Sequence, residues 1–279
     1  MYIPKVHRFF VAILVLLSFN NHLFAQSESN QDVENSDKYE QFEPCIAEVL
    51  RSSDQVKVEL GQVEEVTFLR DNVNLCGPSS TITRRLALRL LELGDTNYDD
   101  KGVELEQDKR EIFDEALEWS RIALSQDTSE HLNYEQMSMA FAALISVSRL
   151  KGKAVLADSV RIYAEEAVRI NPNNDRAYHI LGRWHFEVSQ LSWFLRKLSK
   201  LVFRTSPEGS FKLAINYFNK ALELDNIPVH RYWLGMAYLE SGNTEEALIH
   251  FKQVLQLENV QHNDDYFKRE AQRLIDKHE

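Results

Sequence analysis

The apolar positions in the C-terminal half of the chain follow a helical period, and the whole pattern then repeats. Ala214 and Phe218 lie four residues apart on one helical face, and Ala247 and Phe251 do the same 33 residues later. Residues that favour turns separate these helical stretches. A repeat of this length indicates helical hairpins that bury their apolar faces by stacking on one another.

Small residues recur where the two helices of a hairpin should approach closely, and large apolar or aromatic residues recur beside them. The predicted packing positions are Leu181, Gly182, Ala214, Phe218, Ala221, Leu234, Gly235, Tyr238, Ala247, Phe251 and Val254. The pattern resembles the tetratricopeptide repeat (TPR) family, whose signature has Leu-Gly, an aromatic residue three positions later, and Ala twelve positions after the Gly. This resemblance implies an all-α, TPR-like helical-hairpin solenoid of about three to four repeats.

Other stretches of the chain carry the same helical period. The apolar spacing predicts helices over 81–93, 112–124, 134–150 and 157–170, and Gly94 is expected to end the first of them. A polar helix with one apolar face, 264–277, is predicted to cap the end of the solenoid. We therefore assign residues 81–279 to the repeat domain.

One repeat is longer than the others. Leu181 and Gly182 open it, but Ala214 follows Leu181 by 33 residues where a standard repeat needs 13. About twenty extra residues, 186–205, combine an apolar stripe with a basic side. The candidate partner-contact residues around this insertion are Trp184, Trp193, Arg196, Lys197, Lys200 and Arg204. For the two tryptophans, packing in the core is the alternative.

The insertion makes the resemblance more specific. The residues that carry it are Gly182, Arg183, Trp184, His185, Phe186, Leu191, Ser192, Trp193, Arg196, Lys197, Leu201, Val202, Phe203 and Pro207. Residues 113–277 resemble the TPR-like regulator of microtubule dynamics family. The resemblance implies a protein without catalytic motifs, and some members of that family are associated with microtubules or organelle membranes.

The first 25 residues have the pattern of a secretory signal. Lys5 and Arg8 precede an apolar run over 9–19 that is too short for an ordinary membrane span, and Ala25 offers a small residue for cleavage. An uncleaved anchor is the alternative. Residues 26–43 carry six acids and one Lys, which is typical of a disordered acidic linker. We expect an exported protein, periplasmic or secreted.

Residues 44–80 form a small irregular N-terminal region in this interpretation. Val56, Val58 and Leu60 alternate before Gly61, which is typical of a β-hairpin, and a short irregular helix pair is the alternative. Cys45 and Cys76 both lie in this region. An even pair in an exported protein suggests a disulfide, and two separate buried thiols are the alternative.

Charge limits the classes of partner. The chain carries 32 basic and 43 acidic residues, a formal net charge of −11. Such an excess of acid argues against binding to nucleic acid or broad adhesion to anionic membranes. Local charges are interpreted as solvated surface, including Arg84, Arg85 and Arg89 on the first predicted helix and the Glu64–Glu65 pair.

Motifs for catalysis are missing from the sequence. It holds no phosphate-binding loop and no Gly-x-Ser-x-Gly elbow, and the two cysteines have no zinc-ligand spacing. His179 and His185 fall on different sides of one helix and are interpreted as packing or surface residues. We therefore expect no enzyme, no cofactor and no metal.

These features predict a non-catalytic interaction scaffold or adaptor that binds a peptide or protein in the concave groove of the solenoid. Two alternatives stay open. The chain would be a permanent structural subunit of an envelope assembly if its partner never leaves. It would resemble the regulators of microtubule dynamics in function if residues 1–25 are an organelle-targeting anchor. Contact of the basic insertion with a membrane surface is the weaker alternative to a protein partner.

Overall fold

The described residues of the computed structural model are 42–96, 108–190, 209–260 and 264–279, and they form eleven helices and no strand. The helices are α2 (Pro44–Glu59), α3 (Gln62–Asn72), α4 (Ser80–Thr96), α5 (Lys109–Gln126), α6 (His131–Val147), α7 (Leu150–Ile170), α8 (Asp175–Gln190), α10 (Phe211–Leu224), α11 (Pro228–Glu240), α12 (Thr244–Val254) and α13 (Asp264–His278).

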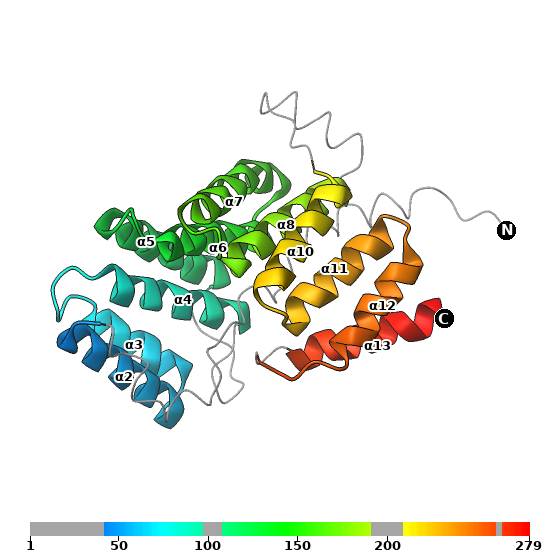
Figure 1. Cartoon of the computed structure of the whole chain (residues 1–279). Helices are drawn as coiled ribbons and strands as arrows, with labels where there is room; N and C mark the ends of the chain where they lie inside the picture. Colours follow the sequence, from blue (N-terminus) through cyan, green and yellow to red (C-terminus); the bar gives the residue numbers. More distant parts are fainter. Residues whose placement is uncertain (1–41, 97–107, 191–208, 261–263) are drawn as a thin grey trace.

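Helices that follow each other along the chain lie side by side (Figure 1). α4 packs on α5, α6 on α7, α8 on α10, and α11 on α12, so these eight helices form four stacked hairpins. The pair α2 and α3 packs at the N-terminal end of the stack, and α13 packs on α11 and α12 at the other end. The predicted all-α solenoid of helical hairpins is confirmed.

Glycines allow the two helices of a hairpin to approach closely. A Cβ atom on Gly182 would lie 2.7 Å from the Phe218 ring, and a Cβ atom on Gly235 would lie 2.7 Å from the Phe251 ring. Real Cβ atoms essentially never approach a ring so closely, so each glycine faces the aromatic residue of its partner helix. The repeated Gly and Phe therefore set the helix separation.

Gly94 has the same role, and the expectation that it ends its helix is wrong. α4 continues to Thr96, and a Cβ atom on Gly94 would lie 2.5 Å from Phe113 of α5. The reason is packing, since the contact with the aromatic ring offsets the weak helix propensity of glycine. Gly94 therefore lies inside the hairpin of α4 and α5, where it faces Phe113.

The N-terminal region is helical, so the β-hairpin interpretation of residues 44–80 is wrong. Gly61 has a φ of 115° and joins α2 to α3 as a tight helix connector. The alternating residues do not share a buried face, because Val58 and Leu60 are 60% and 62% exposed. Val66 and Leu69, three residues apart on α3, are buried instead. The buried residues of this region therefore follow the spacing of a helix and not that of a strand.

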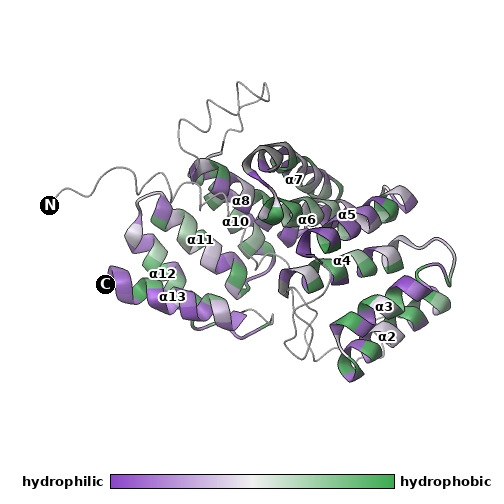
Figure 2. Ribbon diagram, turned by 180° about the vertical axis from the view of Figure 1, so that it is seen from behind, coloured by the Kyte–Doolittle hydropathy of each residue, from purple (hydrophilic) through white to green (hydrophobic). Residues whose placement is uncertain are grey.

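Three large apolar clusters follow one another along the stack, and a small fourth one, Ala47 with Leu50, lies on α2. The first extends from α2 to α8, the second joins α8, α10 and α11, and the third joins α11, α12 and α13. On α13, Phe267, Ala271 and Leu274 are buried while Arg269 and Arg273 between them are exposed, and the helix shows green and purple residues along its length (Figure 2). This is the structure of a capping helix. No described helix has the length and apolarity that crossing a membrane requires.

Candidate interaction surface

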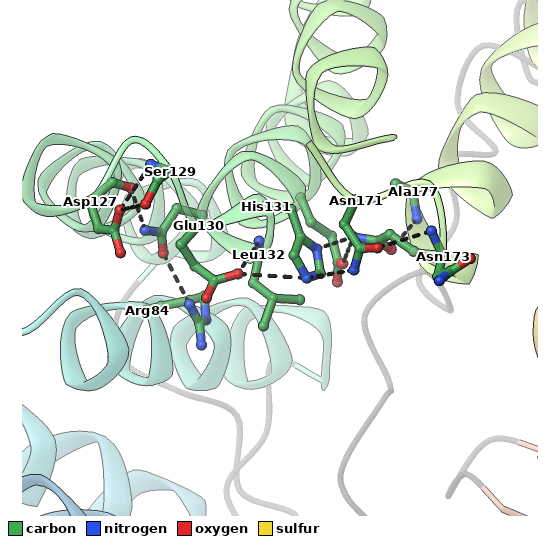
Figure 3. A network of polar contacts seen from close by, with 12 residues as sticks. Arg84, Asp127, Ser129, Glu130, His131, Leu132, Asn171, Asn173 and Ala177 are labelled. Carbon is green, nitrogen blue, oxygen red and sulfur yellow. Dashed lines mark hydrogen bonds and ion pairs between the residues drawn. The ribbon is translucent and has the colours of Figure 1, made fainter. Parts of the chain in front are cut away.

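A chain of polar contacts runs across the first turns of consecutive hairpins (Figure 3). It begins on α4, passes through the α5–α6 connector, and reaches the start of α8 through the α7–α8 connector. At the α4 end, Arg84 Nη1 donates to Asn133 Oδ1 at 3.2 Å. Asn133 is fully buried, and its Nδ2 donates to the Asp127 carbonyl at 2.8 Å. This amide ties α4 to the next hairpin.

Acidic side chains fix the connector between α5 and α6. Asp127 Oδ1 accepts from the Ser129 hydroxyl at 2.7 Å and from the Ser129 backbone N–H at 2.9 Å. These hydrogen bonds lower the pKa of Asp127 below its usual value. Glu130 Oε1 accepts from the Leu132 N–H at 3.1 Å and caps α6. Such caps stabilise a helix because its first N–H groups have no intrahelical partner.

His131 lies between two asparagine amides that both present donors. Asn171 Nδ2 is 2.9 Å from its Nε2, and Asn174 Nδ2 is 2.8 Å from its Nδ1. Each amide is oriented by its oxygen, which accepts a backbone N–H, from Asn173 at 3.0 Å and from Ala177 at 2.9 Å. A neutral imidazole accepts at one nitrogen only. The two amides therefore place one more donor against the ring than a neutral ring can accept from.

Glu135 and Arg176 continue the contacts to α8. Glu135 Oε2 accepts from Asn174 Nδ2 at 2.8 Å, and its other oxygen lies 3.5 Å from Arg176 Nη1. The Glu135 side chain is 5% exposed, whereas that of Arg176 is 38% exposed. We call Arg84, Glu130, His131, Glu135 and Arg176 the polar row. Within the row Glu135 is buried, and solvent reaches part of the other four side chains.

A second set of polar residues joins α8 to α11 beneath the surface. His230 Nε2 lies 2.9 Å from Asp175 Oδ2, and its Nδ1 lies 3.0 Å from His179 Nδ1. Burial lowers the pKa of His179 well below its usual value, so this ring is neutral. His185 is also buried and stacks on Tyr217 at 5.4 Å. Both histidines of α8 are packing residues.

The predicted packing positions lie inside the stack. Leu181, Ala214, Phe218, Ala221, Leu234, Ala247, Phe251 and Val254 are all 1% exposed or less. Gly182 and Gly235 are buried too. Tyr238 is half-buried and stacks on His250 with ring centroids 5.4 Å apart. The tyrosine therefore lies at the edge of its hairpin, with its ring against the second helix.

The candidate contact residues of the insertion divide into two groups. Trp184 is 3% exposed, and its Nε1 donates to the Ala157 carbonyl at 2.8 Å. Its prediction as a partner contact is wrong, because both its ring and its polar atom are satisfied inside the stack. Five of these residues lie outside the described residues: Trp193, Arg196, Lys197, Lys200 and Arg204.

The cysteine prediction is confirmed. Cys45 and Cys76 form a disulfide with their Cα atoms 5.7 Å apart. The bond joins the start of α2 to the loop before α4, so it closes the N-terminal helix pair.

The interpretation of Arg85, Arg89 and Glu65 as solvated charges is wrong. Arg89 is 2% exposed, and its Nε donates to Glu65 Oε1 at 2.9 Å. Arg85 is 7% exposed and pairs with Asp54 at 2.8 Å. These arginines face the helix pair α2–α3 because its carboxylates compensate their charge, as burial of a charge requires. Sequence spacing carried no signal, since the partners lie 24 and 31 residues away.

Comparison with known proteins identifies the family of the chain. The family described as "Regulator of microtubule dynamics protein 1-3" matches residues 49–279. The chain belongs to this family. Its polar row and four hairpins lie within the matched residues, and so does one of the two disulfide cysteines, since only Cys45 precedes them.

Two relatives in the family show how similar the sequences are and how much of each chain is matched. The chain is 23% identical to regulator of microtubule dynamics protein 1 of Homo sapiens over 172 residues, 61% of this chain and 55% of that protein. It is 30% identical to regulator of microtubule dynamics protein 3 of Bos taurus over 118 residues, 42% of this chain and 25% of that protein. The chain thus spans about half the length of the first relative and a quarter of the second.

A solved structure supports the fold of this family member. A thermophilic TPR protein of Thermus thermophilus superposes with a TM-score of 0.57 at 17% sequence identity. The match covers 82% of this chain and 97% of the TPR protein. At this identity the likeness concerns the fold alone.

Proposed function

We propose that this chain is a non-catalytic interaction module that binds a peptide or protein partner along the polar row. The observation that carries the proposal is the continuity of the row across three consecutive hairpins, from Arg84 on α4 to Arg176 on α8. Repeats that stack in a line create an extended surface that suits a partner in extended conformation. The TPR-like fold and the family support an interaction role.

The chemistry of the row favours a partner segment rich in acceptors. Glu130 and Glu135 are engaged at a helix cap and with Asn174, while Arg176 keeps part of its guanidinium in solvent. The amides around His131 supply more donors than the ring accepts. Carbonyl groups of an extended peptide would satisfy such donors. Because the row also lies at helix N-termini, the local field favours negative charge.

We further propose that the protein acts in an exported, periplasmic or secreted compartment. The disulfide between Cys45 and Cys76 supports this location, because such bonds persist in oxidising environments. The signal-like pattern of residues 1–25 supports it as well. The intact mass of the protein isolated from its native compartment tests the proposal. A chain beginning near Gln26 is expected, and retention of residues 1–25 contradicts cleavage.

The family suggests a second candidate function, a role like that of the regulators of microtubule dynamics whose names the relatives carry. It requires residues 1–25 to act as an organelle-targeting anchor that leaves the repeats facing the cytoplasm. The same mass measurement separates the two, since an anchor stays on the chain. A permanent subunit of an envelope assembly would instead co-purify with its partner in fixed ratio.

The polar row is tested by proximity labelling in the native compartment with Arg176→Gln. Gln removes the charge and leaves Glu135 its bond from Asn174, so the fold should persist. Arg121→Gln is the matched control, because Arg121 is 54% exposed and pairs with Glu118 on α5, away from the row. We expect the first variant to lose labelled partners that the control keeps. Identical labelling by both variants would refute the role of the row.

A further inference from the structure

A hollow opens between the second helices of the last two hairpins. It has a volume of about 610 Å³, and helix α10 contributes Asn216, Asn219, Lys220, Leu222 and Glu223 to its lining. Arg231 comes from the start of α11, and His250 comes from α12. We call this site the α10–α12 hollow. It shares no residue with the polar row.

An arginine replaces an aromatic residue at the base of the hollow. Four positions before Gly182, α8 carries Tyr178, whose ring lies 6.3 Å from that of Tyr217. Four positions before Gly235, α11 carries Arg231 instead. The substitution puts a cation where the neighbouring hairpin packs two rings. The hollow therefore holds a positive charge where the equivalent position of the previous repeat holds an aromatic ring.

The guanidinium of Arg231 is held in place. Its Nε and Nη2 donate to Asn226 Oδ1 at 3.0 and 2.7 Å, and its Nη1 donates to Gln253 Oε1. Both partners are neutral amides, so the positive charge is oriented but not compensated. A charge fixed in this way loses little conformational entropy when it meets an anion.

His250 adds a donor to the same site. Its ring stacks on Tyr238, and its Nδ1 lies 3.5 Å from Arg231 Nη1. Burial, followed by the charge of Arg231, lowers the pKa of His250 to about 4, so the ring is neutral near pH 7. Arginine can only donate, so Nδ1 is the acceptor and Nε2 carries the proton.

The charge balance of the hollow opposes that of the whole chain. Lys220 and Arg231 face one acid, Glu223, which pairs with Lys220 at 2.5 Å. The lining thus has one net positive charge on a chain of net charge −11. The side-chain amides of Asn216 and Asn219 have no hydrogen-bond partner among the described residues. They offer both donors and acceptors to a ligand.

We propose that the α10–α12 hollow binds an acidic peptide segment, with a carboxylate of that segment on Arg231 and Lys220 and its main chain on Asn216 and Asn219. An amide side chain matches a peptide group, since each has one carbonyl and N–H donors. Sites for small molecules are mostly apolar and enclose their ligand. This hollow is open, and its charged and amide groups lie beside the apolar surface of Leu222, which suits a segment that crosses it.

Fluorescence anisotropy with fluorescein-labelled hexaglutamate tests the proposal on the purified chain. Lys220→Gln removes a favourable positive charge, and Asn219→Asp adds an unfavourable negative one. Each variant should raise the Kd about tenfold. Lys212→Gln is the matched control, since Lys212 is exposed on the same helix but does not line the hollow. It makes the same change in net charge as Lys220→Gln and should leave the Kd unchanged.

Three results would overturn the proposal. The first is absence of hexaglutamate binding, or equal binding by the Lys220 and Lys212 variants when both melt like the unaltered chain. The second is equal affinity for labelled hexaglutamine, because carboxylates would then be irrelevant. The third is displacement of hexaglutamate by inorganic phosphate at matched ionic strength, which would make the hollow a small-anion site. Weaker hexaglutamate binding at higher sodium chloride is expected in support.

Discussion

Gly235 determines how closely α11 and α12 approach, so adding a single methyl group tests the packing. In Gly235→Ala the new Cβ would lie 2.7 Å from the fully buried Phe251 ring. Overpacking of this kind costs about 1–3 kcal/mol, partly offset by the better helix propensity of Ala. We expect a net loss of stability in urea denaturation.

A double-variant cycle supplies the control. Phe251→Leu removes the ring that the methyl group meets, so Gly235→Ala should be nearly harmless in that background. A variant Gly235→Ala that matches or exceeds the stability of the unaltered chain would show that the ring moves away without strain.

His250 should make stability depend on pH. Its pKa is depressed to about 4 in the folded chain, below the usual value near 6.5. The folded state therefore holds fewer protons than the unfolded state between these values, and stability falls as pH drops from about 6.5 toward 4. In His250→Gln, the loss between pH 7 and pH 5 should be smaller by about 1 kcal/mol, after allowance for the exposed part of the ring.

Urea titrations at both pH values measure this difference. The buried ring of His179 acts in the same direction and remains in the variant, so some dependence on pH should persist. An unchanged dependence would mean that the ring of His250 takes up a proton as easily in the folded chain as in the unfolded one.

Helix positions are readable in this chain where periodicity is long and regular. The apolar residues of α10 and α12 recur at fixed spacing, so hairpin and register follow from the sequence. In α2, the alternating Val56, Val58 and Leu60 gave a false strand signal, because two of these residues face solvent and nothing local reveals this. A helix with few apolar positions, such as α2, does not distinguish the two periods.

The candidate sites were less predictable than the helices for a physical reason. Arg89 and Glu65 form an ion pair between α4 and α3, and only the packed structure brings them together. The polar row likewise depends on connectors that meet across hairpins. The disulfide was predictable because the sequence holds two cysteines, which leaves one possible pairing within the chain.

The disulfide belongs to the helix pair α2–α3, whose two helices contact each other less than those of the later hairpins do. In Cys45→Ser/Cys76→Ser the loop of sequence separation 31 is no longer closed. Chain-entropy reasoning gives a loss of about 3–4 kcal/mol. Thermal unfolding followed by circular dichroism should show a lower melting temperature.

The unaltered chain under reducing conditions is the control for this variant and should melt like it. Equal melting of the oxidised chain and the double variant would mean that the ion pairs and apolar contacts with α4 hold the pair in place without the disulfide.

At the scale of the whole molecule, the separate apolar clusters predict that a core substitution destabilises its own hairpins and leaves the distant ones unchanged. Phe267 of α13 is 1% exposed in the C-terminal cluster, and Phe→Ala changes in cores cost about 3–5 kcal/mol. In Phe267→Ala, hydrogen exchange should accelerate in α11–α13 and stay slow in α4–α7.

Ile249→Ala is the comparison for that experiment, because Ile249 is 44% exposed on α12 and its loss should leave exchange unchanged. Uniform acceleration over all hairpins in Phe267→Ala would show that the solenoid unfolds as one cooperative unit.

The order of the hairpins also bears on how the chain is made. Each helix packs mainly on the next one along the sequence, so most contacts close over short loops, which favours rapid folding. A chain emerging from its N-terminus can therefore complete each hairpin as soon as its second helix has appeared. Cys45 can meet Cys76 once the loop after α3 has been made, before any of the later repeats exist. The disulfide-linked pair α2–α3 would then form first, and each later hairpin would pack on the part of the stack that is already folded.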